Sequence, residues 1–151
     1  KTASLIKTSA KLGAMASDSN QESVNFISEW AWHNGVIFQI TDDILDLSSD
    51  EQTLGKPSGN DILEGTYTLP VLIALSKDKG KYQELLTEIK ENKIDIKNVL
   101  NEFTTKEIID DSKEIINGYL NESIEAIFTL KNHELFPVLE NINNYLINRT
   151  N

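Results

Sequence analysis

The stretch of sequence from Gly35 to Leu47 reads GVIFQITDDILDL, and it decides both the fold class and the candidate chemistry. Its apolar residues recur at helical spacing and continue a pattern that begins at about Glu22. We therefore expect one long helix from Glu22 to about Leu47. Asp42 and Asp46 are four residues apart, so such a helix places both carboxylates on one face.

The acidic face of this helix is unfavourable unless a cation is bound. Asp42 and Asp46 repel each other by roughly 0.2–0.5 kcal/mol, and each lies near the negative end of the helix dipole, which costs about 0.3–1 kcal/mol more. A divalent cation reverses the sign of these terms, and Mg²⁺ prefers one or two carboxylates together with substrate phosphates. The spacing therefore favours a Mg²⁺–diphosphate site, with a solvated acidic helix end as the alternative.

Three further residues belong to the same candidate site. Gln39 and Gly35 lie on the stripe of the two aspartates, and Asp43 flanks it. A glycine inside a helix costs roughly 1 kcal/mol relative to alanine. Gly35 therefore indicates that something approaches the helix backbone closely at this position.

The glycine-containing segment after the aspartates carries a second phosphate signal. Lys56 is the one cation between Asp42 and Glu64, and the glycines and proline around it indicate a loop over residues 48–60. A lysine in such a loop can contact a phosphate, although a solvated loop lysine is the alternative. Neither an EF-hand nor a P-loop fits this segment, because the glycines that those motifs require are absent.

Composition and charge narrow the class of protein. The chain has 151 residues with 39 % apolar and 25 % charged residues, which is enough for a folded core of one ordinary domain. Its net charge of −10 disfavours nucleic acid as a partner. The absence of cysteine excludes disulfides and thiolate chemistry. No apolar run is long enough for a transmembrane anchor. We expect a cytoplasmic protein that associates peripherally with the membrane.

The rest of the chain also reads as helix, so the predicted fold class is all-α, a helical bundle. We expect one all-α unit over residues 1–151, with motif-bearing helices in 1–75 and packing helices in 76–151. Pro70 and Pro137 are expected in first turns of helices, where proline is tolerated. The first helix starts at Lys1 without an acidic first turn, which is typical of a chain cut into an existing helix. A short processed leader is the alternative.

Three ordered motifs resemble those of the trans-polyprenyl diphosphate synthases, also called the polyprenyl synthetase family. They are the second aspartate-rich motif, the glycine-lysine loop and the K-T-A-x-L element. The matching residues are Gly35, Phe38, Gln39, Asp42, Asp43 and Asp46 in the first, Gly55, Lys56, Gly59, Asp61 and Gly65 in the second, and Lys1, Thr2, Ala3 and Leu5 in the third. Within the family, the Thr68-Leu69-Pro70 sequence is closer to long-chain bacterial enzymes, including two-component heptaprenyl diphosphate synthases.

The resemblance implies the isoprenoid synthase type of bundle, C-terminal half only, and a chemistry. Family members join isopentenyl diphosphate head to tail to an allylic diphosphate with the help of Mg²⁺. By this resemblance Asp42 is a direct Mg²⁺ ligand, and Asp43 and Asp46 support it or hold the waters of the metal. Contacts to the diphosphate are implied for the side chains of Lys1, Thr2, Gln39 and Lys56, and Asp61 is implied to position the lysine-and-metal network.

The chain also departs from the family pattern. The family's first aspartate-rich motif and its isopentenyl diphosphate site lie upstream of the K-T element and are not in this sequence. We therefore expect a prenyltransferase that is inactive alone and needs the N-terminal half or a second subunit as partner, in a homo- or hetero-oligomer. A half-bundle also leaves an apolar surface exposed. The alternatives are a non-catalytic helical subunit that binds diphosphates or a partner synthase, and a terpene-cyclase-like enzyme. The sequence does not fix product length or allylic primer.

Overall fold

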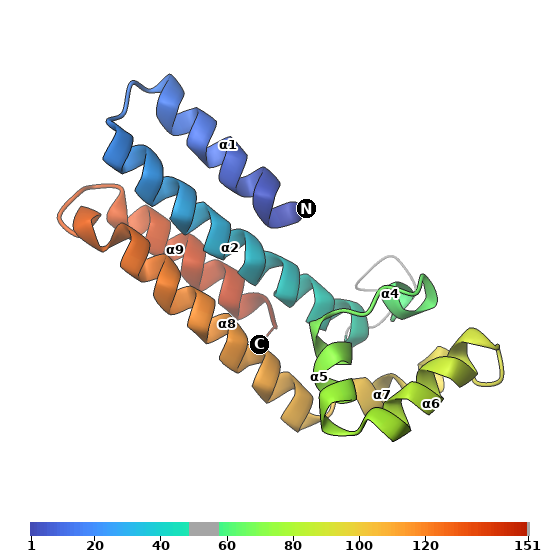
Figure 1. Cartoon of the computed structure of the whole chain (residues 1–151). Coiled ribbons are helices and arrows are strands. Elements are labelled where there is room, and N and C mark those ends of the chain that lie inside the picture. Colours follow the sequence, from blue (N-terminus) through green and yellow to red (C-terminus); the bar gives the residue numbers. More distant parts are fainter. Residues whose placement is uncertain (49–57, 151) are drawn as a thin grey trace. The chain divides into compact units, whose positions relative to one another are not determined.

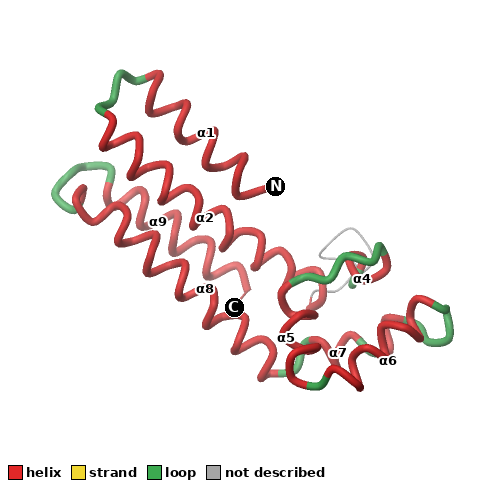
Figure 2. Tube along the Cα trace, viewed as in Figure 1, coloured by secondary structure: helices red, strands yellow, loops and turns green. Residues whose placement is uncertain are grey.

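The computed structural model describes residues 1–48 and 58–150, and the described chain is built of helices without a strand. Figures 1 and 2 show the helices and the short turns that join them. The α-helices are α1 (Thr2–Ala16), α2 (Gln21–Ser48), α4 (Asn60–Leu63), α5 (Leu69–Lys77), α6 (Lys79–Lys90), α7 (Leu100–Phe103), α8 (Lys106–Ile127) and α9 (Phe136–Ile147). Single 3₁₀ turns are η1 (Ile96–Asn98), η2 (Phe128–Leu130) and η3 (Asn148–Thr150). The predicted all-α class is confirmed.

The chain divides into two compact units, and α2 and α8 each contribute to both. Unit 1 comprises residues 1–41 and 115–151, and unit 2 comprises residues 42–114. The expectation that residues 1–151 form one all-α unit stays a prediction.

Unit 1 is a layer of long helices. In Figures 1 and 2, α1, the first part of α2, the last part of α8 and α9 lie side by side. Their apolar faces meet in a cluster formed by Trp30 and Ala31 of α2, Ile127 of α8 and Leu139 of α9. The side chains of α1 that pack against this cluster are small or medium in size, Ile6 and Ala10 among them. The amphipathic period of 3.6 residues explains why these helices bury one face each.

Unit 2 is built from shorter helices around an apolar core. Phe103 and Val71 are fully buried at its centre, and Tyr82 packs against Phe103 with ring centroids 5.4 Å apart. The core also contains Leu47, Ile62, Ile73, Ala74, Leu86, Ile89, Ile96, Val99 and Ile108. Leu47, in the last turn of α2, is therefore a core residue of this unit.

Several element boundaries agree with the sequence pattern. The long helix predicted from Glu22 to about Leu47 is α2, and Pro70 and Pro137 lie in the first turns of α5 and α9. The apolar residues from Ile94 to Phe103 also recur at helical spacing, but this stretch forms η1 and α7 rather than one continuous helix. Its break has a local cause, since the Asp95 side chain accepts a hydrogen bond from the backbone N–H of Lys97 and caps a single turn.

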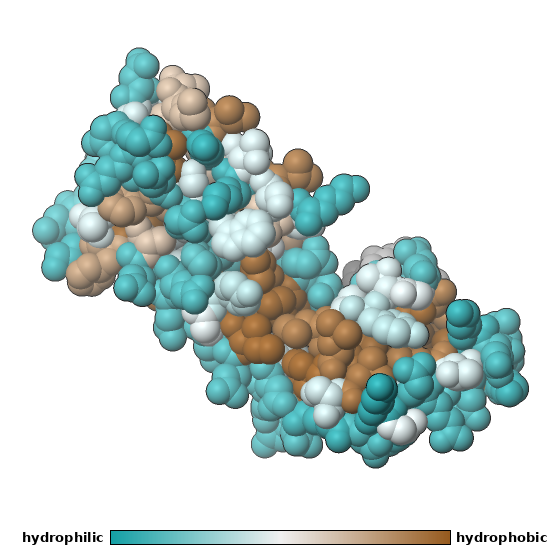
Figure 3. All heavy atoms as spheres, in the orientation of Figure 1, coloured by the Kyte–Doolittle hydropathy of each residue, from teal (hydrophilic) through white to brown (hydrophobic). Residues whose placement is uncertain are grey.

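Unit 1 exposes large apolar side chains, as expected for a half-bundle. One group lies on α1, and a second lies along α9 and the turn before it. The exposed side chains are Leu5, Leu12 and Met15 in the first group, and Leu135, Val138, Ile142 and Tyr145 in the second. Figure 3 shows apolar side chains on the visible surface of α1, and others gathered over α5 in unit 2. Within the described residues, no helix has the length and apolar character needed to cross a bilayer.

Candidate diphosphate and metal site

The start of α1 lies against α2 at two matched positions. Ala3 of α1 packs directly on Gly35 of α2, where a Cβ would lie 2.6 Å from the Ala3 Cα. The close neighbour expected at Gly35 is therefore the backbone of α1 at Ala3. One turn further along α2, the Thr2 hydroxyl donates a hydrogen bond to the Gln39 side-chain oxygen over 2.8 Å. Lys1 is the exposed N-cap residue of α1. The structure thus brings the predicted residues Thr2 and Gln39 together.

The three aspartates all lie on α2 near its C-terminal end, and they differ in burial. Asp42 is half-buried, whereas Asp43 is 8 % and Asp46 2 % exposed. A solvated acidic helix end would leave all three side chains in water, so the burial of Asp43 and Asp46 argues against that alternative. Carboxylates excluded from water are favoured where a cation or several hydrogen-bond donors lie close to them.

Asp46 also anchors the chain that returns after the segment outside the described residues. Its backbone oxygen accepts a hydrogen bond from the Gly59 N–H over 2.8 Å, and its Oδ2 accepts a long one from the Asp61 N–H over 3.4 Å. Gly59 has φ +73°, and a Cβ there would lie 2.7 Å from the Ile96 side chain. The left-handed conformation favours glycine at this position, and a Cβ would also require the end of the Ile96 side chain to move. Asp61, in the first turn of α4, is thereby held next to Asp46.

The donor set of this region suits a hard divalent cation. Asp42, Asp43, Asp46 and Asp61 offer carboxylate oxygens, which are the ligands that Mg²⁺ and Ca²⁺ prefer. Among the described residues no group of three or more potential ligands converges closely enough to hold a metal ion by itself. Lys56, the predicted loop lysine, lies outside the described residues.

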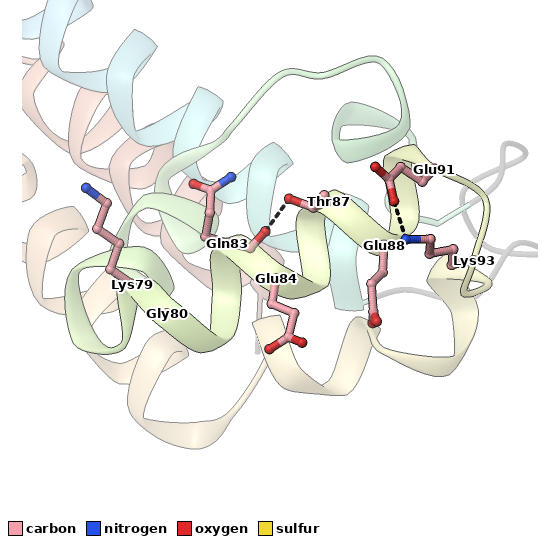
Figure 4. Close-up of a pocket in the computed structure, with 8 residues that line it drawn as sticks. All are labelled: Lys79, Gly80, Gln83, Glu84, Thr87, Glu88, Glu91 and Lys93. Carbon is pink, nitrogen blue, oxygen red and sulfur yellow. Dashed lines mark hydrogen bonds and ion pairs between the residues drawn. The ribbon is translucent and has the colours of Figure 1, made fainter.

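The pocket drawn in Figure 4 is separate from these residues in sequence. It is an open hollow of about 590 Å³ along α6, and its lining includes Lys79, Glu84, Glu88 and Lys93. The two contacts drawn there are local ones, from the Thr87 hydroxyl to the Gln83 oxygen and between Lys93 and Glu91. Mixed charges on one exposed helix face are ordinary solvated surface, so this hollow adds nothing to the candidate site.

A buried polar network in unit 1 was not predicted from the sequence. The indole N–H of Trp30 donates to Asn143 Oδ1 over 3.0 Å, and the Ser123 hydroxyl donates to the same oxygen over 3.2 Å. The Asn34 amide N–H₂ donates to Ser123 Oγ over 2.7 Å and to the Trp30 carbonyl over 2.9 Å. The network joins α2, α8 and α9. The only signal in the sequence was a set of polar residues at otherwise apolar helical positions.

Lysine ion pairs join the helices of unit 2 at its surface. Lys77 contacts both Asp111 and Glu107 at 2.7 Å, and these contacts raise the pKa of Lys77, with the Asp111 hydrogen bond as the largest cause. The hydrogen bond from Lys81 to Glu102 likewise raises the pKa of Lys81. These pairs connect α5 with α8 and α6 with α7. None of them involves a residue of the candidate site.

Comparison with known proteins assigns the class. The polyprenyl synthetase family model matches residues 1–104, which is more than half of the chain. This chain belongs to the polyprenyl synthetase family.

Particular relatives and solved structures refine this assignment. Heptaprenyl diphosphate synthase component 2 of Bacillus subtilis is 35 % identical over 130 residues, which cover 86 % of this chain and 37 % of that protein. The crystal structure of heptaprenyl diphosphate synthase from Staphylococcus aureus matches with a TM-score of 0.85 at 29 % identity, over 100 % of this chain and 48 % of that one.

A third structure is geranylgeranyl pyrophosphate synthase from Corynebacterium glutamicum, complexed with calcium and isoprenyl diphosphate. It matches with a TM-score of 0.83 at 28 % identity, over 99 % of this chain and 48 % of that one. The chain thus spans about half the length of these two structures. It spans 37 % of the Bacillus relative. These matches confirm the isoprenoid synthase type of fold and show that the chain corresponds to its C-terminal half.

Proposed function

We propose that this chain is the C-terminal catalytic part of a long-chain trans-polyprenyl diphosphate synthase. The reaction is the Mg²⁺-dependent head-to-tail condensation of isopentenyl diphosphate with an allylic diphosphate. The observation that carries the proposal is the end of α2, where Asp43 and Asp46 are buried carboxylates next to a half-buried Asp42. Family membership and relatives named as prenyl diphosphate synthases support it.

The bond changes define what the protein has to do. The C–O bond of the allylic diphosphate breaks and leaves an allylic cation, and the alkene of isopentenyl diphosphate attacks that cation to form the new C–C bond. Loss of a proton then restores an alkene. Bound Mg²⁺ neutralises the charge that develops on the departing diphosphate. The side chains around it have to orient the diphosphate and keep water away from the cation.

Each predicted residue has a role in this proposal. Asp42 holds Mg²⁺ directly, and Asp43 and Asp46 support it from buried positions. Asp46 in turn is tied to Asp61 through the backbone N–H of the latter, so Asp61 fixes the chain beside the carboxylates. Contacts to the diphosphate are proposed for Lys1, Thr2, Gln39 and the loop residue Lys56.

The metal and substrate classes have support from a relative. The Corynebacterium enzyme is described as a complex with calcium and isoprenyl diphosphate, and calcium shares the preference for oxygen ligands. The name of the Bacillus relative, component 2, supports a partner subunit. We propose that the partner, or the remainder of a longer chain, supplies the second half of the metal clamp and the isopentenyl diphosphate site.

Replacement of Asp42 tests this function in the synthase that contains this chain and its completing half. Asp42→Ala should lower Mg²⁺-dependent turnover on the order of 10³-fold, since one charge-stabilising group at the departing diphosphate is lost. Asp110→Ala is the matched control, because Asp110 is an exposed aspartate of α8 and should leave turnover within about twofold. Unchanged turnover of the Asp42→Ala variant would overturn the proposal.

A further inference from the structure

The crossing of α1 and α2 is tightest at one point, between Ala3 and Gly35. A Cβ on Gly35 would lie 2.6 Å from the Ala3 Cα, 3.0 Å from its Cβ and 3.4 Å from its carbonyl carbon. The first of these distances is to backbone, which cannot rotate away as a side chain can. A methyl group needs about 3.5–4.0 Å from another carbon atom. The missing side chain of Gly35 therefore lets α1 approach about 1 Å closer than an alanine would allow.

Other small residues of these helices differ from Gly35. Ala31 lies one turn earlier on α2, is fully buried in the cluster of unit 1, and carries a methyl group. Gly13 in α1 and Gly118 in α8 have nothing within 4 Å of a built Cβ. Among the helical glycines of the described residues, Gly35 is thus the one whose missing side chain is replaced by a neighbouring backbone. It lies at the end of the crossing where Thr2 and Gln39 meet.

The close approach determines the distance between two residues of the candidate site. Thr2 is adjacent to Ala3, and Gln39 lies one turn beyond Gly35 on α2. Their side chains form a hydrogen bond of 2.8 Å. A displacement of α1 by about 1 Å would lengthen this contact to roughly 3.8 Å, which is beyond hydrogen-bond range.

We propose that Gly35 and Ala3 form a positioning pair for the allylic diphosphate. Neither residue touches the substrate in this proposal. Their contact holds the start of α1 so that Lys1 and Thr2 face the diphosphate together with Gln39. The inference rests on the proposed function, and it adds two residues that set the affinity for one of the two substrates. A misplacement of about 1 Å in such a site can cost up to about 10²-fold in rate.

A matched pair of glycine variants tests the proposal in the active synthase that contains this chain and its completing half. Gly35→Ala should raise the KM for farnesyl diphosphate about tenfold or more and leave the KM for isopentenyl diphosphate within about twofold. Gly118→Ala makes the same substitution at an exposed helical position without neighbours, and it should leave both KM values unchanged. A merely structural role for Gly35 predicts less folded enzyme, hence a lower kcat with both KM values unchanged, and that result would overturn the proposal.

A second variant checks the mechanism from the side of α1. Adding Ala3→Gly to Gly35→Ala removes the methyl group that lies 3.0 Å away but leaves the Ala3 Cα at 2.6 Å. Because the backbone contact remains, the double variant should keep most of the raised KM for farnesyl diphosphate. Full recovery of the wild-type KM in the double variant would contradict a backbone cause.

Failure of the proposed function is distinguishable from failure of this inference. If the wild-type synthase makes no product, the condensation proposal fails. In that case the positioning pair is tested by calorimetric binding of inorganic diphosphate with Mg²⁺ to the same protein. Gly35→Ala should weaken that binding about tenfold relative to wild type and Gly118→Ala. Equal binding by all three proteins would overturn the positioning role.

Discussion

Within each of the two units, a different kind of contact holds the helices together. Unit 1 adds two features to its apolar cluster. They are the buried polar network around Asn143 and the backbone contact at Gly35. Unit 2 joins short helices through apolar packing around Phe103, with lysine ion pairs at its surface. Polar networks and close backbone contacts fix one geometry, whereas apolar packing tolerates exchange of similar side chains. We therefore expect the stability of unit 1 to depend on the exact shape and polarity of its buried side chains. The stability of unit 2 should depend mainly on the volume of its buried side chains.

The largest effect on stability is expected from the core of unit 2. Phe103→Ala removes a fully buried ring and should lower the free energy of unfolding by about 3–5 kcal/mol. Circular dichroism during denaturant unfolding measures this change for all helices. Phe128→Ala is the control, because Phe128 is 55 % exposed.

The Phe103→Ala variant also tests whether the two units unfold in one transition. Trp30 and Trp32 are the two tryptophans of the chain, and both lie in unit 1. Because α2 and α8 continue from one unit into the other, we expect tryptophan fluorescence and circular dichroism to report one shared transition. A fluorescence transition that stays in place while the circular dichroism transition shifts would refute the prediction of a single all-α unit.

An intermediate effect is expected from the polar network of unit 1. Asn143→Ala leaves the Trp30 indole N–H and the Ser123 hydroxyl without their acceptor. The free energy of unfolding should fall by about 1–3 kcal/mol, the cost of buried polar groups that lose their partner. Asn141→Ala, at an exposed position of the same helix, should change it by less than about 0.5 kcal/mol. If both variants changed the free energy of unfolding equally, the buried network would contribute nothing specific to the stability of unit 1.

The smallest effect is expected from the surface ion pairs of unit 2. Lys77→Met removes the contacts to Asp111 and Glu107 and should lower the melting temperature slightly, and less so at high salt. The pKa of Lys77 is raised from 10.5 in the folded chain. Its contribution is therefore fully present below pH 10.5 and is lost as the pH rises through the raised pKa. Melting curves of Lys77→Met and of wild type should differ by a constant amount from pH 6 to about pH 9 and converge above pH 10.5. A difference that grows with pH would contradict the ion-pair account.

The long helices were predictable, whereas the break between η1 and α7 was not. Over α2 and α8, many turns of apolar periodicity add to one signal, so single residues do not alter the prediction. Over Ile94–Phe103 the apolar spacing is equally helical, but the capping of a single turn by Asp95 decides the outcome. Local side-chain hydrogen bonds of this kind compete with helix continuation and have no periodic signature.

The candidate site was predictable in part. The i,i+4 spacing of Asp42 and Asp46 and the unfavourable glycine at Gly35 are both visible in the sequence, and the structure gives Gly35 a close neighbour. The burial of Asp43 and Asp46 was not visible in the sequence. For Asp46 the contacts come from the chain that returns at Gly59. The network of Trp30, Ser123 and Asn143 also escaped prediction, since its members are separated by up to 113 positions in the chain. The roles predicted for the site residues all stay predictions; these residues are Lys1, Thr2, Gln39, Asp42, Asp43, Asp46, Lys56 and Asp61.

A condensation assay tests whether this chain is one catalytic half of a prenyl diphosphate synthase. The chain is incubated with Mg²⁺, farnesyl diphosphate and labelled isopentenyl diphosphate, once alone and once with the polypeptide that supplies the other half of the family fold. We expect no extended product from the chain alone and a longer prenyl diphosphate from the mixture. Diphosphate binding without product in the mixture would contradict it and would instead support a non-catalytic binding subunit. Product from the chain alone would contradict the proposed division of the metal clamp between two halves.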